Sequence, residues 1–573
     1  MNPIIKMLGR YKKEAILGPL FKLLEAVFEL LVPLVVASLI DGGILRKDKS
    51  HIVQMFIFLI LLAVIGLISS VTAQYFAAKA AVGVSTRLRS ELFRKIQSFS
   101  FSEIDKTGAS TLITRMTGDV NQVQNGINMF LRLFLRSPFI VFGAMIMAFT
   151  VDFQSALVFV GVIPVLFAVV FAIILVSIPL YKKVQEKLDK VTLKTRENLT
   201  GVRVIRAFCR EDKEINDFRQ MNQELADSQN YVGKISALMN PVTYVIINTA
   251  IIVLIYVGAI RVEQGIITQG AVVALYNYMS QILVELIKLA NLIITMTKSV
   301  ACAGRVTAIL KTESSLESIN ADSECGKKES GNYIEFSDVG LVYKGAGEES
   351  LSNISFSVKK GETVGIIGGT GSGKTSLVHL IPHFYDCTSG GIYIDGINVK
   401  AYPVEELRKK IGIVMQKSVL FKGTIRENIL WGNGNASEKE ISEAIEAAQA
   451  ADVVNSKKDG LDEMIEQNGR NLSGGQRQRL TIARALVRKP EILILDDSSS
   501  ALDYATDAKL RQSIKKLGSN MTVFIVSQRT SSIMYADKII VLDDGKIVGT
   551  GTHEQLLESC EVYREIHLSQ NEK

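Results

Sequence analysis

Six long apolar segments in the first three hundred residues limit most strongly what this chain can fold into. A helix needs ~20 mostly apolar residues to cross the hydrocarbon core of a bilayer, and each segment approaches or exceeds that length. We therefore predict six membrane-spanning helices, at about residues 16–40, 52–78, 129–150, 153–180, 242–260 and 271–296.

The connections between these segments alternate in length and charge. Residues 85–128 and 181–240 form long loops that are rich in Lys and Arg. Since cytoplasmic loops carry an excess of these residues, we expect both long loops and both termini in the cytoplasm. Arg46, Lys47 and Lys49 in the first external loop oppose this orientation but are outnumbered.

Each long loop also has helical periodicity on both sides of a break, at residues 106–108 and at 200–201. This pattern predicts helices that continue ~20 Å or more beyond the bilayer. Charges lie inside two spans, Glu25 and Glu29 in the first and Glu285 and Lys288 in the last. Charges at that depth are costly and usually face a cavity or lie near the interface.

The overall composition supports a membrane protein. The 573 residues are 48% hydrophobic with a net charge of only +7, and Lys and Arg collect between the apolar segments. We therefore expect a lipid bilayer as a partner and no nucleic acid. The five cysteines are scattered without a metal-ligand spacing, which argues against a disulfide framework or a zinc site.

After a polar stretch at residues 311–331, the sequence changes to that of a soluble α/β domain. Short apolar strands are expected at residues 333–336, 351–358, 363–367, 492–495, 523–526 and 538–542, alternating with helical segments. Such alternation predicts a largely parallel sheet covered by helices. We expect a multi-domain protein, with a six-helix all-α transmembrane domain (1–310), a linker (311–331) and an α/β nucleotide-binding domain (332–573).

A complete phosphate loop, or P-loop, joins the strand at 363–367 to a helical run. Its glycines let backbone N–H groups point at phosphate oxygens, and the helix start adds its positive end. We expect ATP here, with Lys374 at the β- and γ-phosphates and the Thr375 hydroxyl on Mg²⁺. The loop consists of Gly368, Gly369, Thr370, Gly371, Ser372, Gly373, Lys374 and Thr375. Asp496, at the carboxyl end of the strand 492–495, is a second expected Mg²⁺ ligand.

Between these two motifs lies Leu472-Ser473-Gly474-Gly475-Gln476, which resembles the signature of the ATP-binding cassette (ABC) family. Tyr343 resembles the aromatic residue that stacks on adenine, Gln416 the Q-loop glutamine, and residues 500–503 the D-loop. The order of the motifs and the two long loops resemble a half-transporter of the exporter type, over essentially the whole chain.

The resemblance implies how such a chain works. Two cassettes dimerise head to tail, so each ATP lies between one chain's P-loop and the other chain's signature residues, here Ser473, Gly474, Gly475 and Gln476. Gln416 is implied in catalysis and in Mg²⁺ binding, and residues 106–110 and 200–206 in coupling. The implied partner is a second ABC half-transporter, and the implied cargo is a drug-like or amphiphilic molecule, a lipid or a peptide. A bacterial cell membrane, with the nucleotide-binding domain in the cytoplasm, is the expected location.

Two positions depart from the active form of the family. Asp497 stands where the family has the glutamate that polarises the attacking water, and Gln528 where it has histidine. The shorter carboxylate and the missing imidazole both weaken hydrolysis, while the features for ATP binding are intact. We therefore expect the degenerate-site subunit of a heterodimeric, multidrug-type exporter, with Asp497, Gln528 and Gln416 as its catalytic positions.

Two other functions fit parts of this pattern. An ATP-gated channel or regulatory subunit would use a weak site for gating, but no long regulatory insertion separates the spans from the cassette. An importer would usually carry its spans and cassettes on separate chains.

Overall fold

The structure is a computed structural model that describes residues 3–313, 315–316, 331–518 and 520–571. Its contacts divide the chain into two compact units. The helical unit comprises residues 1–97 and 110–312, and the sheet unit residues 98–109 and 313–573. Most of the predicted linker, residues 311–331, lies outside the described residues.

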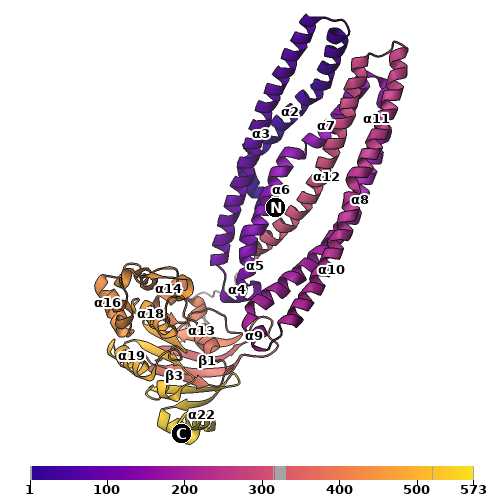
Figure 1. The fold of residues 1–573 in the computed structure, drawn as a ribbon. Coiled ribbons are helices and arrows are strands. Elements are labelled where there is room, and N and C mark those ends of the chain that lie inside the picture. Colours follow the sequence, from indigo (N-terminus) through magenta and orange to yellow (C-terminus); the bar gives the residue numbers. More distant parts are fainter. Residues whose placement is uncertain (1–2, 314, 317–330, 519, 572–573) are drawn as a thin grey trace. The chain divides into compact units, whose positions relative to one another are not determined.

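Six helical segments within the described residues are long and apolar enough to cross a membrane, which confirms the predicted spans (Figure 1). They cover Ile4–Ile44, Lys49–Gln97, Ala109–Val151, Phe153–Thr200, Glu211–Glu263 and Gln269–Lys311. Their helices are α1 (Pro3–Leu8), η1 (Gly9–Tyr11), α2 (Lys12–Ser38), η2 (Leu39–Ile44), α3 (Lys49–Gln97), α5 (Ala109–Thr114), η3 (Arg115–Asp119), α6 (Val120–Leu133), α7 (Arg136–Val151), α8 (Phe153–Thr200), α10 (Glu211–Ala237), α11 (Met239–Glu263) and α12 (Gln269–Lys311), with α9 (Val202–Ala207) between α8 and α10.

The long helices continue well beyond the predicted spans. At 1.5 Å per residue, α3 extends about 28 Å past residue 78 before it ends at Gln97. The predicted breaks are also present. The short helix α4 (Phe101–Thr107) ends at Gly108, whose φ of 76° suits glycine, and α8 ends at Thr200, before Gly201.

Small residues bring α2 and α3 close together. Ala26, Ala73 and Ala77 are fully buried, and a Cβ atom added at Gly18 would lie 3.4 Å from the backbone nitrogen of Ala77. Such residues let helix backbones approach each other in a medium that supplies no hydrophobic force between helices. An apolar core formed by α2, α7, α8, α11 and α12 holds the unit together.

Charged side chains from three spans meet inside the helical unit, and we call them the membrane charge cluster. Arg136 of α7 donates from Nη1 to Glu285 Oε1 of α12 and from Nη2 to Glu29 Oε2 of α2, both at 2.6 Å. Lys288 and Ser137 also donate to Glu285, each at 2.8 Å. The cluster is completed by the pair Lys22–Glu25 on α2. The charges expected inside the spans therefore pair with one another.

The sheet unit contains a six-stranded sheet in the order β12-β11-β3-β10-β9-β6, in which only β12 runs antiparallel to its neighbour. This sheet confirms the predicted parallel core. The two predicted strands nearest the linker lie elsewhere, in an antiparallel sheet of order β2-β1-β4-β5. The strands are β1 (Ile334–Leu341), β2 (Leu351–Val358), β3 (Thr363–Gly368), β4 (Ser389–Ile394), β5 (Ile397–Asn398), β6 (Ile411–Val414), β9 (Ile492–Asp496), β10 (Thr522–Val526), β11 (Lys538–Asp543) and β12 (Lys546–Gly551), with β7 (Gly423–Thr424) and β8 (Met464–Ile465) forming a separate pair.

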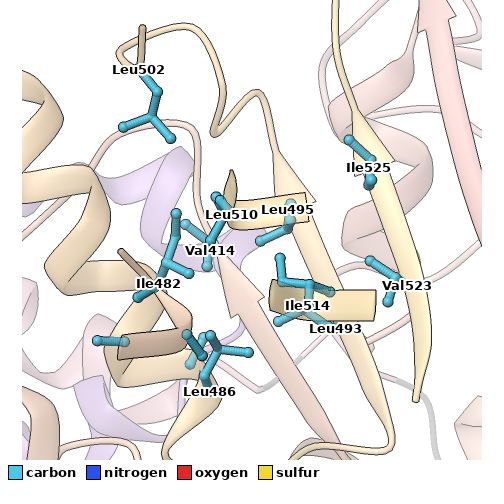
Figure 2. Packing of buried hydrophobic residues seen from close by; sticks show 14 of the residues in the cluster. Val414, Ile482, Leu486, Leu493, Leu495, Leu502, Leu510, Ile514, Val523 and Ile525 are labelled. Carbon is cyan, nitrogen blue, oxygen red and sulfur yellow. The ribbon is translucent and has the colours of Figure 1, made fainter. Parts of the chain in front are cut away.

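Helices pack on the parallel sheet because its central strands are apolar on both faces. Figure 2 shows Leu510 and Ile514 of α19 beside Leu493 and Leu495 of β9, with α18 contributing further apolar side chains. The remaining helices of the unit are α13 (Lys374–Leu380), η4 (Val399–Ala401), α14 (Val404–Lys410), α15 (Ile425–Leu430), α16 (Glu438–Ala447), α17 (Ala451–Asn455), η5 (Gly460–Asp462), η6 (Gln467–Gly469), α18 (Gly474–Leu486), α19 (Tyr504–Lys516), α20 (Thr530–Ile533), α21 (His553–Ser559) and α22 (Glu561–Asn571).

Candidate functional site

The P-loop runs from the end of β3 to the start of α13, as the sequence predicts. Glycine is required at both ends of the loop for different reasons. A Cβ atom at Gly368 would lie 2.0 Å from the carbonyl oxygen of Leu542 on β11. Gly373 has a φ of 92°, which side chains rarely allow. The backbone thereby turns tightly enough to bring several N–H groups together at the start of a helix.

Lys374 holds its ammonium group over the loop. Nζ donates to the carbonyl oxygens of Gly368 at 2.9 Å and Gly369 at 2.5 Å. The residue is 9% exposed, and burial lowers the pKa of its ammonium group, while the charges of Asp497 and Asp496 oppose that shift. A buried cation beside a glycine-rich turn at the start of a helix is suited to bind phosphate oxygens.

Asp496 ends β9 and lies beside the loop. Thr375 Oγ1 donates to Asp496 Oδ1 at 3.1 Å, whereas Oδ2 is buried and has no hydrogen-bond partner within the described parts of the chain. Burial raises the pKa of Asp496 to about 6. The hydroxyl, carboxylate and amide oxygens of Thr375, Asp496 and Gln416 are the kinds of ligand that Mg²⁺ prefers. These residues therefore fit Mg²⁺, which would neutralise phosphate charge when bound.

Asp497, the next residue, has a left-handed backbone conformation with a φ of 46°. Its N–H donates to the carbonyl oxygen of Val526 on β10 at 3.0 Å, which ties it to the neighbouring strand. Burial raises the pKa of the Asp497 carboxyl group, and a hydrogen bond with Gln416 and the charges of Lys374 and Arg529 oppose that shift.

A cavity of about 750 Å³ brings most of the predicted residues together. Of those named from the sequence, its lining contains Thr370, Gly371, Gly373, Lys374, Thr375, Gln416, Asp496, Asp497 and Gln528. Gly368, Gly369 and Ser372 belong to the same loop but do not line the cavity. Asp497 and Gln528 thus share one cavity with the P-loop.

Tyr343, expected at the adenine, lies next to this cavity without lining it. Its hydroxyl donates to Ser376 Oγ at 2.9 Å, and Ser376 is a lining residue. The Tyr343 ring meets Tyr385 edge-on, with 5.1 Å between the ring centroids.

The signature residues are not part of this cavity. Ser473 caps α18: its Oγ accepts a hydrogen bond from the N–H of Gln476 at 3.2 Å, and Gln476 Oε1 accepts one from the N–H of Ser473 at 3.0 Å. Ser473 and Gly474 are exposed. A Cβ atom at Gly475 would lie 3.0 Å from the carbonyl oxygen of Ala501, so the signature packs closely on the predicted D-loop.

Sequence reasoning missed a contact made by the last helix of the chain. Gln570 on α22 donates to the carbonyl oxygen of Gln528 at 2.7 Å and accepts from the N–H of Thr530 at 2.9 Å. This side chain therefore holds the backbone on both sides of Arg529. No motif points to it, because a single glutamine near a chain end has no distinctive spacing.

Comparison with known proteins assigns both units to ABC transporter families. Residues 15–286 match the family described as the ABC transporter transmembrane region, and residues 351–500 match the ABC transporter family. The uncharacterized ABC transporter ATP-binding protein YfiB of Bacillus subtilis (strain 168) is 37% identical over 572 residues, which are 100% of this chain and 98% of the relative. The putative multidrug export ATP-binding/permease protein YgaD of the same organism is 31% identical over an alignment of 600 positions, which covers 100% of this chain and 99% of that protein.

A solved structure shares the fold. A bacterial Atm1-family ABC exporter with ATP bound superposes with a TM-score of 0.82 at 22% identity, covering 99% of each chain. Six spans, an α/β unit with a P-loop and full-length relatives lead to one conclusion. The chain is a multi-pass membrane protein that belongs to the ABC transporter family, with the transmembrane and ATP-binding regions of the exporter fold fused in one polypeptide.

Proposed function

We propose that this chain is one half of a heterodimeric ABC exporter. It binds Mg-ATP in its own cavity but hydrolyses it slowly, and it lends its signature residues to the ATP site of a partner half-transporter. The observation that carries this proposal is the composition of one cavity, in which Asp497 and Gln528 occupy the same walls as Lys374 and Thr375.

Both departures weaken water activation rather than binding. An aspartate carboxylate is one methylene shorter than that of glutamate, and a misplacement of ~1 Å at a reacting centre can cost on the order of 10²-fold in rate. Gln528 can donate a hydrogen bond but has no titratable ring. The groups that would hold the nucleotide, Lys374, Thr375 and Asp496, are all in place.

The exposure of the signature residues supports the proposal that they serve the ATP site of a partner. Ser473 and Gly474 are exposed at the amino-terminal end of α18, a helix of 13 residues. Backbone N–H groups and the helix dipole there favour an anion. An exposed, intact signature can complete a γ-phosphate site on another cassette, even though the chain's own cavity is weakened.

The membrane part of the proposal rests on the spans and the charged loops. We assign the cassette and both termini to the cytoplasm because residues 85–128 and 181–240 are rich in Lys and Arg. The proposed coupling segments are α4 and α9. The proposed cargo is a drug-like or amphiphilic molecule, a lipid or a peptide, and the name of the relative YgaD, a putative multidrug exporter, supports the first of these.

The test uses the full chain, purified alone and reconstituted in lipid. We expect it to bind ATP but to hydrolyse it slowly. The double substitution Asp497→Glu with Gln528→His restores the missing groups and is expected to raise the ATPase rate on the order of 10²-fold, since two copies can supply intact signatures to each other.

Two controls accompany this comparison. Adding Ser473→Ala to the restored chain should abolish the gain, because the signature would then be incomplete. Replacing Asp497 with Asn should leave the low starting rate nearly unchanged. A purified native chain that already hydrolyses ATP as fast as the restored variant contradicts the proposal.

A further inference from the structure

Two buried polar atoms at the ATP site lie close to each other, and neither has a hydrogen-bond partner among the residues that the structure describes. They are Nε2 of His379 and Oδ2 of Asp496, 3.8 Å apart. The two side chains are 12% and 1% exposed. Leaving a buried donor or acceptor unpaired is unfavourable, so this arrangement requires an explanation.

His379 lies one turn along α13 from Thr375, on the helix that begins with Lys374. Aromatic rings fix the side chain in place. The imidazole lies nearly parallel to the ring of Tyr385, with 6.4 Å between centroids and an interplanar angle of 14°. Phe384 meets it edge-on at 5.6 Å.

The same two aromatic residues contact α4, which belongs to the sheet unit. The Tyr385 hydroxyl donates to Asp105 Oδ2 at 2.6 Å. The ring of Phe101 stacks on Phe384 with 4.4 Å between centroids. A continuous series of contacts therefore leads from Asp105 through Tyr385 and His379 to Asp496.

We propose that His379 is a positioning residue for Asp496: Nε2–H donates to Oδ2 and keeps Oδ1 on the side of Thr375, where Mg-ATP is to bind. The proposal rests on the proposed function, since it assumes that this cavity holds Mg-ATP. A shift of about 1 Å closes the 3.8 Å separation to a hydrogen bond. Because the ring lies against Tyr385, a movement of α4 reaches the metal-binding carboxylate through His379.

If His379 positions Asp496, its loss should change the affinity for Mg-ATP. A residue behind a metal ligand typically changes metal affinity by ~10–100-fold when it is lost. Nε2 of His379 lies 3.8 Å from the expected Mg²⁺ ligand Asp496, so its loss should weaken ATP binding only when Mg²⁺ is present. General damage to α13 would instead weaken ATP binding with and without the metal.

The experiment measures ATP affinity of the full chain in lipid nanodiscs, in excess Mg²⁺ and in EDTA, by displacement of a fluorescent ATP analogue. For His379→Leu we expect about a 10-fold loss of affinity in Mg²⁺ and a change below about twofold in EDTA. His379→Gln, which carries an amide N–H donor, should recover most of the loss. Tyr385→Phe keeps the ring and removes the bond to Asp105, and should cost about threefold in Mg²⁺.

The outcomes separate this inference from the proposed function. Equal losses in Mg²⁺ and EDTA for His379→Leu, or no rescue by His379→Gln, overturn the positioning role. Unchanged affinity in Mg²⁺ overturns it as well, while leaving the proposed function intact. A native chain that binds no ATP, like a Lys374→Ala control, overturns both.

Discussion

Buried charges occur in two regions of this molecule and are handled in opposite ways. In the membrane charge cluster, Arg136 has carboxylates at both of its terminal nitrogens, and Glu285 accepts from three donors. Nε of Arg136 has no hydrogen-bond partner among the described residues, but a carboxylate oxygen of Glu25 lies 3.9 Å away. In the ATP cavity, counting described residues alone, one oxygen of Asp496 has no hydrogen-bond partner, and Lys374 donates to backbone carbonyl and hydroxyl oxygens.

This difference in pairing distinguishes charges that stabilise the fold from charges that are available to a ligand. Charges that are mostly paired with one another hold elements together and have little left to offer a ligand. Charges that remain unsatisfied in a cavity are ready to bind one. Substitutions in the first region should therefore change stability and spare ATP binding, and substitutions in the second should do the reverse.

The largest effect is expected from Glu285→Ala. Removing this carboxylate leaves Nη1 of the buried Arg136 without its acceptor and breaks the link between α7 and α12, which should lower the free energy of unfolding by ~3–5 kcal/mol. The measurement is thermal or denaturant unfolding of the full chain in detergent, together with its ATP affinity.

The matched control is Glu263→Ala, an exposed glutamate at the end of α11, which should cost little. The double substitution Arg136→Met with Glu285→Leu should recover much of the lost stability. If Glu285→Ala lowers ATP affinity strongly and leaves stability unchanged, the membrane charge cluster does not have the structural role assigned to it.

Lys374→Ala should have the opposite effect, a loss of ATP affinity with little change in stability. It removes the buried ammonium group that is expected to hold two phosphates, and we expect ATP affinity to fall on the order of 10²-fold, as for the loss of ~3 kcal/mol of charged hydrogen bonds. Stability without nucleotide should change little. Lys409→Ala, an exposed lysine on α14, is the control, and a similar loss in that variant would argue against a specific phosphate site.

Gln570→Leu tests a smaller effect in the ATP-binding unit. The N–H of Thr530 loses its acceptor, so exchange of this amide with solvent should speed up by about 10-fold, as for one buried hydrogen bond. Ser569→Ala on the same helix is the control, because its hydroxyl bonds only within α22. Unchanged exchange at Thr530 would mean that α22 does not hold this loop.

Local and regular features of the molecule could be predicted from the sequence. The six spans follow from apolar length alone, and the P-loop and Asp496 follow from a fixed order of strand, glycines, lysine and acid. Each span and the P-loop is marked within one short segment, and Asp496 is recognised because its strand follows the P-loop in the expected order. The two helix breaks were also visible, because Gly108 and Gly201 interrupt a continuous helical pattern.

Pairings between distant residues could not be predicted. Arg136 and Glu285 are 149 positions apart, and nothing in either span indicates that they meet. The antiparallel sheet of β1 and β2 was missed for a similar reason, since a short apolar strand does not reveal its neighbour. His379 looks like one more residue on a buried helix until Asp496 and Tyr385 are placed around it.

The smallest expected effect concerns Tyr343. Its substitutions distinguish two roles for the side chain, stacking on adenine and support of α13. If the ring stacks on adenine, Tyr343→Leu should weaken ATP binding by about 2- to 10-fold, in keeping with ~0.5–1.5 kcal/mol for an aromatic pair. Binding of inorganic triphosphate, which has no base, should be unchanged. Tyr343→Phe removes only the hydrogen bond to Ser376 and should cost about twofold or less. An equal loss for ATP and triphosphate would instead assign Tyr343 to the support of α13, because only the placement of the P-loop would then have changed.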